Sequence, residues 1–486
     1  MKDLKRKALH GGLARFCGQV ASFALRLTSV VVLARLLSPE EFGLAAMAII
    51  VAGVYELFSS SLCSATIQKD TVSHEQASTL FWINIAIGVV LGLLCFATAP
   101  LLVAFYNEPR LFWATGALGL GFLLSSLGVQ HSGLLARQLR YVILAVIDIV
   151  ALSASIIVSI GLAWWGAGFW ALVAGAITTP AVSSAGMWLA SRWIPGPPRR
   201  VAGTGSLLLF GGTMTLNGVV IYIAYNIEKV LLGRFWGAEA LGVYGRAYQL
   251  INFPTTIINA SVGSVAFAAL SRLQDDPATY KRYFLKGYAL VNSVTMPTTL
   301  LCAVFAEEVI QILLGPKWSA AVPIFQLLAP TVLVFGLINP MAWLLFSLGY
   351  QKRSLALALV ISPIVIIAYI VGLPYGPTGV ALAYSTAMTL WLVPHILWCL
   401  RGTLISPSEL VVAISPPLVS ALAAAAVGFL VDRVLDSLHA SIATAALAAT
   451  IMCATYVVVL FYAFGQKALF LDVLRDLRGR AAPAAG

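Results

Sequence analysis

Long apolar stretches recur along the whole chain, separated by short polar segments rich in Pro, Gly and charged residues. A stretch of ~20 apolar residues is long enough for an α-helix to cross the hydrocarbon core of a bilayer. The pattern predicts about fourteen spanning helices, centred near residues 23, 53, 91, 123, 153, 179, 219, 255, 299, 334, 363, 389, 420 and 452. We therefore predict an all-α integral membrane protein.

Composition supports the same class and excludes others. Of the 486 residues, 60% are hydrophobic and only 10% are charged, whereas soluble domains contain ~25% charged residues. The first apolar segment is too long for a cleaved signal peptide and lacks a small-residue cleavage site. The six cysteines lie in apolar segments without a CxxC pair, and we expect them to be small core residues. Without a phosphate-binding loop, metal-ligand cluster or nucleophile motif, we expect no cofactor, no metal site and no enzymatic activity.

The basic residues indicate the orientation in the membrane. Most of the 30 Lys and Arg residues fall in alternate loops, and such loops lie on the cytoplasmic side. We therefore expect both termini to be cytoplasmic, which requires an even number of spans. The net charge of +11 then reflects topology, so it gives no reason to expect nucleic-acid binding.

The chain contains an internal repeat with an offset of 199 residues. Residues 31–44 read VVLARLLSPEEFGL and residues 230–243 read VLLGRFWGAEALGV, with identical Val, Leu, Arg, Glu and Gly positions. A second echo relates GAGFWAL at 166–172 to GPTGVAL at 376–382. Six helices followed by six of the same orientation form a parallel repeat, which transporters use as two lobes.

The repeat predicts the domain organisation. We expect an N-terminal lobe over residues 1–200 (helices 1–6) and a C-terminal lobe over 201–402 (helices 7–12), related by a pseudo-twofold axis. Two extra transmembrane helices follow in 403–466, and residues 467–486 form a cytoplasmic tail. The Pro-rich segment 194–200 marks the boundary between the lobes.

Polar side chains form a stripe on the first predicted helix. Spacings of three and four place them on one face: Arg15, Gln19, Ser22, Arg26 and Ser29. Arg26 lies near the helix centre, where an arginine costs roughly 2.5 to 3.5 kcal/mol on insertion scales and normally faces a polar cavity or a partner. The stripe favours a helix that lines a wet, cationic pathway. The alternative is a buried pair of Arg26 with Glu56 of the next helix.

A second polar face occurs on the eighth predicted helix. Its members are Gln249, Asn252, Thr256 and Asn259, with Arg246 at the outer edge and Asn217, Tyr222, Tyr225 and Asn226 on the seventh helix as further candidates. Amide and hydroxyl groups of this kind suit sugar hydroxyls. Each of them alone is explained equally well by hydrogen bonding between packed membrane helices.

The acidic residues divide into two groups. Glu56, Asp148 and Glu228 lie at membrane depth and are candidates for proton coupling, although Lys229 beside Glu228 and a helix end near Asp148 offer structural explanations. The pairs at 40–41 and 275–276 lie beside helix ends, where capping explains them. In the first hairpin we expect Ser38 to cap the following helix.

The hairpin motif resembles a known family. The runs that carry the resemblance are 31–44, KVLLGR at 229–234, LGVY at 241–244, RAYQL at 246–250 and ALSRLQ at 269–274. They are similar to bacterial polysaccharide transporters, the Wzx-type lipid-linked oligosaccharide flippases, over about the first 400 residues. The resemblance is strongest to exopolysaccharide and colanic-acid-type members. The last two spans match no motif of the family.

The resemblance implies the fold of the multidrug/oligosaccharidyl-lipid/polysaccharide exporter superfamily, in the bacterial inner membrane. It implies a transporter that flips undecaprenyl-diphosphate-linked oligosaccharide units for exopolysaccharide or lipopolysaccharide assembly, by alternating access of two lobes around a cationic cavity. Membrane lipid, a polysaccharide polymerase and export machinery are the further candidate partners. A multidrug cation antiporter of the same superfamily is the alternative. A membrane enzyme of polysaccharide assembly is a third candidate, which the short outer loops disfavour.

Overall fold

The computed structural model describes residues 21–50, 73–198, 226–439 and 442–467, together with residues 18, 53, 222 and 470. Every regular element within these residues is helical. The chain forms two compact units, Met1–Gly245 and Arg246–Gly486. The predicted lobe boundaries stay predictions.

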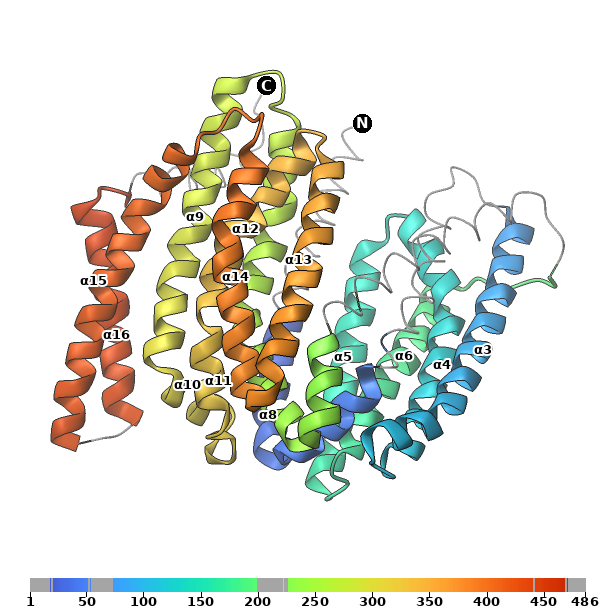
Figure 1. The fold of residues 1–486 in the computed structure, drawn as a ribbon. Coiled ribbons are helices and arrows are strands. Elements are labelled where there is room, and N and C mark those ends of the chain that lie inside the picture. The colour runs from blue at the N-terminus through green and yellow to red at the C-terminus, as the bar shows by residue number, and fades with distance from the viewer. Residues whose placement is uncertain are drawn as a thin grey trace. The chain divides into compact units, whose positions relative to one another are not determined.

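The first unit contains helical residues 21–36 and 39–50 and the first part of α8. Its other helices are α3 (His74–Tyr106), α4 (Leu111–Arg137), α5 (Tyr141–Trp164) and α6 (Trp170–Ser191) (Figure 1). α3 begins with a capping box. The Ser73 backbone N–H donates to Gln76 Oε1 and the Gln76 backbone N–H donates to Ser73 Oγ, each at 3.2 Å. Within this unit, α4 packs against both α3 and α6.

Small residues let the helices of the first unit approach closely. A Cβ atom on Gly92 of α3 would lie 2.9 Å from the carbonyl oxygen of Gly119 of α4, and the reverse contact would be 2.8 Å. Between α4 and α6, the Ser184 hydroxyl donates to the carbonyl oxygen of Leu124 at 2.6 Å. Close backbone approach and short hydrogen bonds replace the hydrophobic driving force that membrane helices lack.

The second unit continues α8 (Ile227–Ser271) and adds eight longer helices to it. These are α9 (Pro277–Val304), α10 (Ala306–Leu313), α11 (Ala321–Leu328), α12 (Pro330–Ser347), α13 (Gln351–Gly372), α14 (Gly376–Leu400), α15 (Pro407–His439) and α16 (Ile442–Val458), with single turns η1 (Pro316–Trp318) and η2 (Leu373–Tyr375) and the π-helical η3 (Val459–Ala463). α9 begins after Asp276, whose carboxylate accepts from the Thr279 N–H at 3.0 Å. This bond holds the pKa of the Asp276 carboxyl below its usual range, as the predicted capping role requires.

Nine segments of the described residues are long and apolar enough to cross a membrane. They contain the predicted centres near residues 91, 123, 153, 179, 299, 334, 363, 389, 420 and 452. The segment Gln351–Leu400 holds two of these centres, because η2 divides it into α13 and α14. The centre near 255 lies in α8, and those near 23, 53 and 219 involve residues outside the described part. The predicted all-α membrane fold is confirmed.

Large apolar side chains on these spans face outward, as expected for helices surrounded by lipid. Ile157 of α5 is 71% exposed and Leu390 of α14 is 72% exposed. Trp164 and Trp165 at the end of α5 are also exposed, in the position that tryptophan favours at a membrane interface. Cys453 is exposed on α16, so its prediction as a core residue is wrong. An apolar segment in a membrane has a lipid-facing side, and sequence composition does not separate that side from the core.

Within the second unit, α16 contacts α9 at a backbone carbonyl that lacks its usual helical hydrogen bond. Pro297 lies inside α9 and has no N–H, so the carbonyl of Ser293 four residues earlier lacks its usual helical donor. The hydroxyl of Tyr456 on α16 donates to that carbonyl oxygen at 2.7 Å, at a buried site. Around it, Ala421 of α15 and Met452 of α16 belong to the same buried cluster as α9 and α12 residues. In Figure 1 the α15–α16 pair lies beside α9.

We expect Tyr456→Phe to lower the thermal midpoint of the purified protein in detergent. The substitution leaves the Ser293 carbonyl buried without a donor, which costs roughly 1–3 kcal/mol. Tyr462→Phe is the matched control, because Tyr462 is 75% exposed in η3 and should be neutral.

The same substitution in a Pro297→Ala chain tests whether the Tyr456 hydroxyl compensates for the donor that Pro297 lacks. In Pro297→Ala the backbone N–H of the introduced alanine supplies the missing helical donor, so Tyr456→Phe should cost less there than in the native chain. An equal cost in both backgrounds would show that the hydroxyl does not compensate for the proline.

Candidate functional site

The backbone shows the repeat at the two hairpin turns. α8 consists of two helical runs joined at Gly237, whose φ of 83° and ψ of −175° interrupt the helix. In the first hairpin the break lies at Leu37 and Ser38, and Ser38 is the repeat equivalent of Gly237. At the second echo, Gly166 and Gly376 both have positive φ, of 84° and 73°. The two halves of the chain therefore turn at corresponding places.

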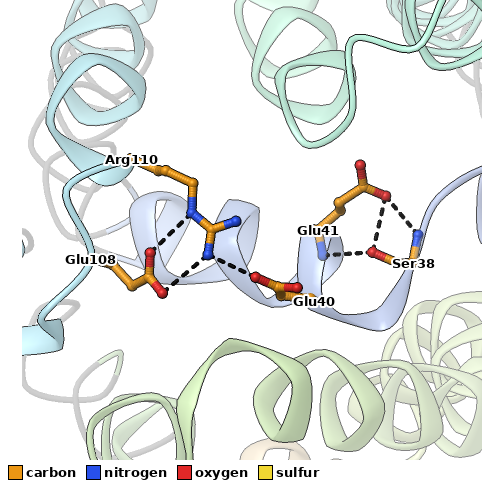
Figure 2. A network of polar contacts seen from close by, with 5 residues as sticks. All are labelled: Ser38, Glu40, Glu41, Glu108 and Arg110. Carbon is orange, nitrogen blue, oxygen red and sulfur yellow. Dashed lines mark hydrogen bonds and ion pairs between the residues drawn. The ribbon is translucent and has the colours of Figure 1, made fainter.

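A capping box shapes the turn of the first hairpin (Figure 2). Glu41 Oε2 accepts hydrogen bonds from the Ser38 backbone N–H at 2.7 Å and from its hydroxyl at 3.0 Å, while Ser38 Oγ accepts from the Glu41 N–H at 3.3 Å. The predicted cap is confirmed. The other Glu41 carboxylate oxygen lies over Gly168, where a Cβ atom would be only 2.5 Å away. The hairpin is thereby seated on the turn between α5 and α6.

An ion-pair cluster joins the same hairpin to the turn between α3 and α4 (Figure 2). Arg110 contacts Glu108 through two donors, at 3.0 and 3.1 Å, and Glu40 through Nη2 at 2.7 Å. Glu108, followed by Glu40, raises the pKa of the Arg110 guanidinium above its ordinary value. Because the side chains of Arg110 and Glu40 are about half exposed, the cluster positions the loop more than it stabilises the fold.

The predicted polar face of α8 is partly engaged within its own helix. Arg246 Nη1 donates to Gln249 Oε1, so two residues predicted to meet substrate contact each other. The hydroxyls of Thr255 and Thr256 both donate to the carbonyl oxygen of Asn252, at 2.9 and 2.8 Å. Arg246, Gln249 and Asn252 are half-buried, and Thr256 is exposed. The side chain of Asn259 lies outside the described part.

Arg26 is exposed and Ser22 is half-buried on helical residues 21–36. An exposed guanidinium is what a cavity-lining role requires, and the role itself stays a prediction. The remaining predicted substrate residues Arg15, Gln19 and Asn217 lie outside the described residues, as does Glu56, the alternative partner of Arg26.

The two described acidic candidates differ in environment. Glu228 is 1% exposed at the start of α8, and no described side chain donates a hydrogen bond to its carboxylate. The neighbouring Lys229 ammonium donates instead to Asn226 Oδ1 at 2.7 Å. The suggested Lys229 partner is therefore directed elsewhere. Asp148 is exposed on α5.

The hairpin glycines form a contact that the sequence motif alone does not identify. Gly43 and Gly242 are buried, and each lies against the backbone of the other repeat. The sequence does offer one sign of this contact. The glycine is one of five identities in the repeat, and it lies inside a helix, where glycine is intrinsically unfavourable. A helical glycine shared by both repeats indicates close packing, but not which element packs there.

Comparison with known proteins shows the family of the chain. The family model described as "Polysaccharide biosynthesis protein" matches residues 32–323, from the first hairpin into α11. The chain belongs to this family. A relative is the lipopolysaccharide biosynthesis protein WzxC of Escherichia coli (strain K12), which is 26% identical over 352 residues, or 71% of each chain. The predicted resemblance to polysaccharide transporters is confirmed.

Solved structures show the fold. The lipid II flippase MurJ in an inward closed conformation aligns with a TM-score of 0.76 at 15% identity, covering 95% of this chain and 100% of that one. A multidrug resistance MATE family transporter of the MOP superfamily, in its inward-facing conformation, aligns at 0.63 and 11% identity, covering 78% and 94%. The chain therefore has the multi-pass helical fold of these two transport proteins.

We expect Ser38→Ala to destabilise the protein more than Arg110→Ala. Loss of an N-cap hydroxyl costs ~0.5–2 kcal/mol, whereas a half-exposed ion pair contributes ~0–1 kcal/mol. Thermal midpoints of the two purified variants in detergent measure the difference. A larger loss in Arg110→Ala would mean that the ion cluster, not the cap, fixes this hairpin.

Proposed function

We propose that this protein flips undecaprenyl-diphosphate-linked oligosaccharide repeat units from the cytoplasmic to the periplasmic leaflet of the bacterial inner membrane. The units would serve exopolysaccharide or lipopolysaccharide assembly. The mechanism is alternating access of two lobes around a cationic cavity, and both termini lie in the cytoplasm. Family membership and the flippase-type fold support the class. The observation that supports an anionic substrate is the positive charge of Arg26 and Arg246 at membrane depth.

A diphosphate headgroup needs such cations. An anion that leaves water for an apolar layer faces a large desolvation cost unless it is paired and hydrogen-bonded. The arginine fork offers parallel N–H donors that match phosphate oxygens and is more weakly hydrated than an ammonium group. Arg26 presents an exposed guanidinium on the first helix, with Arg15 on the same face in sequence. We assign the diphosphate to this face.

The sugars are assigned to α8. Gln249, Asn252, Thr256 and Asn259 recur along one face of this helix at spacings of three and four. The intrahelical bond of Thr256 uses its one hydroxyl proton and leaves oxygen lone pairs free to accept from a sugar hydroxyl. The hydrogen bond to Gln249 orients Arg246 at the edge of this face. The lipid tail stays in the bilayer, and polymerase and export machinery are the expected partners for the released unit.

The likeness to a multidrug transporter favours one alternative, a cation antiporter. Such a protein needs an anionic pocket for its substrate. The charged residues of the predicted first-helix and α8 faces are Arg15, Arg26 and Arg246, which repel cations. The flippase is therefore the better supported function.

We expect Arg26→Ala to lower the translocation rate roughly tenfold or more, because a lost charge-assisted hydrogen bond is worth ~1.5–3 kcal/mol. Arg26→Lys keeps the charge without the fork, so its loss should be smaller. Purified protein in liposomes with an undecaprenyl-diphosphate oligosaccharide is followed by access of a glycan-cleaving enzyme to the headgroup. Protein levels should stay normal.

Thr28→Ala is the matched control, since Thr28 is exposed on the same helix and its hydroxyl donates to the Ala24 carbonyl oxygen at 2.9 Å. Wild-type translocation in Arg26→Ala would remove Arg26 from the substrate site. No exchange by the wild-type protein, with several glycans and an imposed potential, would favour the antiporter.

We further propose that Glu228 is the coupling group, with Glu56 and Asp148 as the weaker candidates. A buried carboxylate without a donating side chain is costly when charged, so it can exchange a proton as its surroundings change. Glu228→Gln should translocate at a rate that no longer responds to an imposed pH gradient. Glu239→Gln, at an exposed position just beyond the Gly237 break of α8, is the control. A normal response to the gradient in Glu228→Gln would exclude Glu228 from coupling.

A further inference from the structure

The two repeat hairpins contact each other through two glycines at equivalent positions. A Cβ atom on Gly43 would lie 1.7 Å from the carbonyl oxygen of Ala238, and one on Gly242 would lie 1.8 Å from the carbonyl oxygen of Pro39. Gly43 and Gly242 are repeat equivalents, and so are Pro39 and Ala238. The contact is therefore one interaction made twice, by each repeat on the other. Both glycines are in the compact unit Met1–Gly245.

Only glycine fits at these two positions. The atoms that a side chain at 43 would meet are backbone, with Ala238 C at 2.5 Å and Cα at 2.9 Å, and at 242 they include Pro39 C at 2.8 Å. Backbone atoms within helices cannot rotate away as the end of a long side chain can. Since carbon atoms in contact lie ~3.5–4.0 Å apart, even an alanine must separate the hairpins by about 1–2 Å.

The contact continues inward along one face of helical residues 39–50. Met47 Cε is 3.2 Å from the position that a Cβ on Gly233 would occupy. Further along, the Tyr222 hydroxyl donates to the carbonyl oxygen of Ile50 at 3.1 Å. Positions 39, 43, 47 and 50 follow helical spacing, so one face of this helix lies against the second repeat.

The nature of the glycine contact suits a joint that opens and closes. At both sites a carbonyl oxygen occupies the place that a Cβ atom would take, so the two backbones pack directly against each other. At the two turns the glycines meet backbone atoms of the other hairpin, while the side chains of Met47 and Tyr222 continue the contact along the helix. The charge pattern predicts that both turns lie on the outer side of the membrane, opposite the termini.

We propose that Gly43 and Gly242 form the outer gate of the transport pathway. Their backbone contact closes the pathway at the outer end, and separation of the two hairpins opens it toward the periplasm. The inference rests on the proposed transport function and adds the residues that close the pathway.

The first test measures the gate directly. Spin labels are attached at Leu36→Cys and Phe235→Cys, which are equivalent positions, 38% and 66% exposed, beside the two turns, in a chain whose native cysteines are replaced by alanine. Gly43→Ala and Gly242→Ala should each shift the label distances to longer values. Gly245→Ala should match the parent, because a Cβ on Gly245 of α8 meets no atom within 4 Å.

The second test is the liposome translocation assay with undecaprenyl-diphosphate oligosaccharide, in the native-cysteine background. Overpacking a close contact should shift the balance between closed and open conformations roughly tenfold or more, so each alanine variant should lose translocation. Gly245→Ala should retain it. Ala238→Gly should not rescue Gly43→Ala, because the atoms in conflict are backbone.

The outcomes separate the gate from the transport function. Longer distances with reduced translocation in both glycine variants support the gate. Unchanged distances, normal translocation despite longer distances, or rescue by Ala238→Gly would each overturn it. If the wild-type protein does not translocate the probe, the proposed function fails, while the label distances still report whether the two glycines hold the hairpins together.

Discussion

The hydrocarbon core of a membrane offers no hydrogen-bond partners, and the packing of this protein depends on that constraint. Each backbone polar group within a span must find its partner inside the protein. α9 shows the consequence, because Pro297 removes one donor and the Tyr456 hydroxyl of α16 replaces it at Ser293. The last two helices, which match no family motif, are thereby part of the packed core of the second unit.

The same constraint explains how the helices approach one another. Without hydrophobic attraction between helices in lipid, stability comes from close contact and from hydrogen bonds of small side chains. Gly92 against Gly119 and Ser184 against Leu124 are examples within the first unit. At the two hairpins the backbones themselves are in contact. This contact requires glycine at positions 43 and 242, because any side chain there would collide with the backbone of the other hairpin.

Charge in the membrane is restricted for the same reason, and its distribution connects structure to transport. Arg26 is exposed, whereas Arg246 is held by Gln249 and the Glu228 carboxylate is buried without a donating side chain. A flippase needs cations that meet an anionic headgroup and a group whose charge can change during the cycle. The proposed roles of Arg26 and Glu228 rest on these different environments.

The sequence by itself determined the class, the span positions within the described residues, the repeat and the family, because apolar length and the turn motif are local properties that a bilayer constrains strongly. It also identified the Ser38–Glu41 cap, whose partners are three residues apart. Tertiary structure alone decided that Gly43 meets Ala238, that Tyr456 meets Ser293, and that Lys229 is directed at Asn226 rather than at Glu228. The first two contacts join helices far apart in the chain and the third depends on side-chain orientation, neither of which a pattern of residue types encodes.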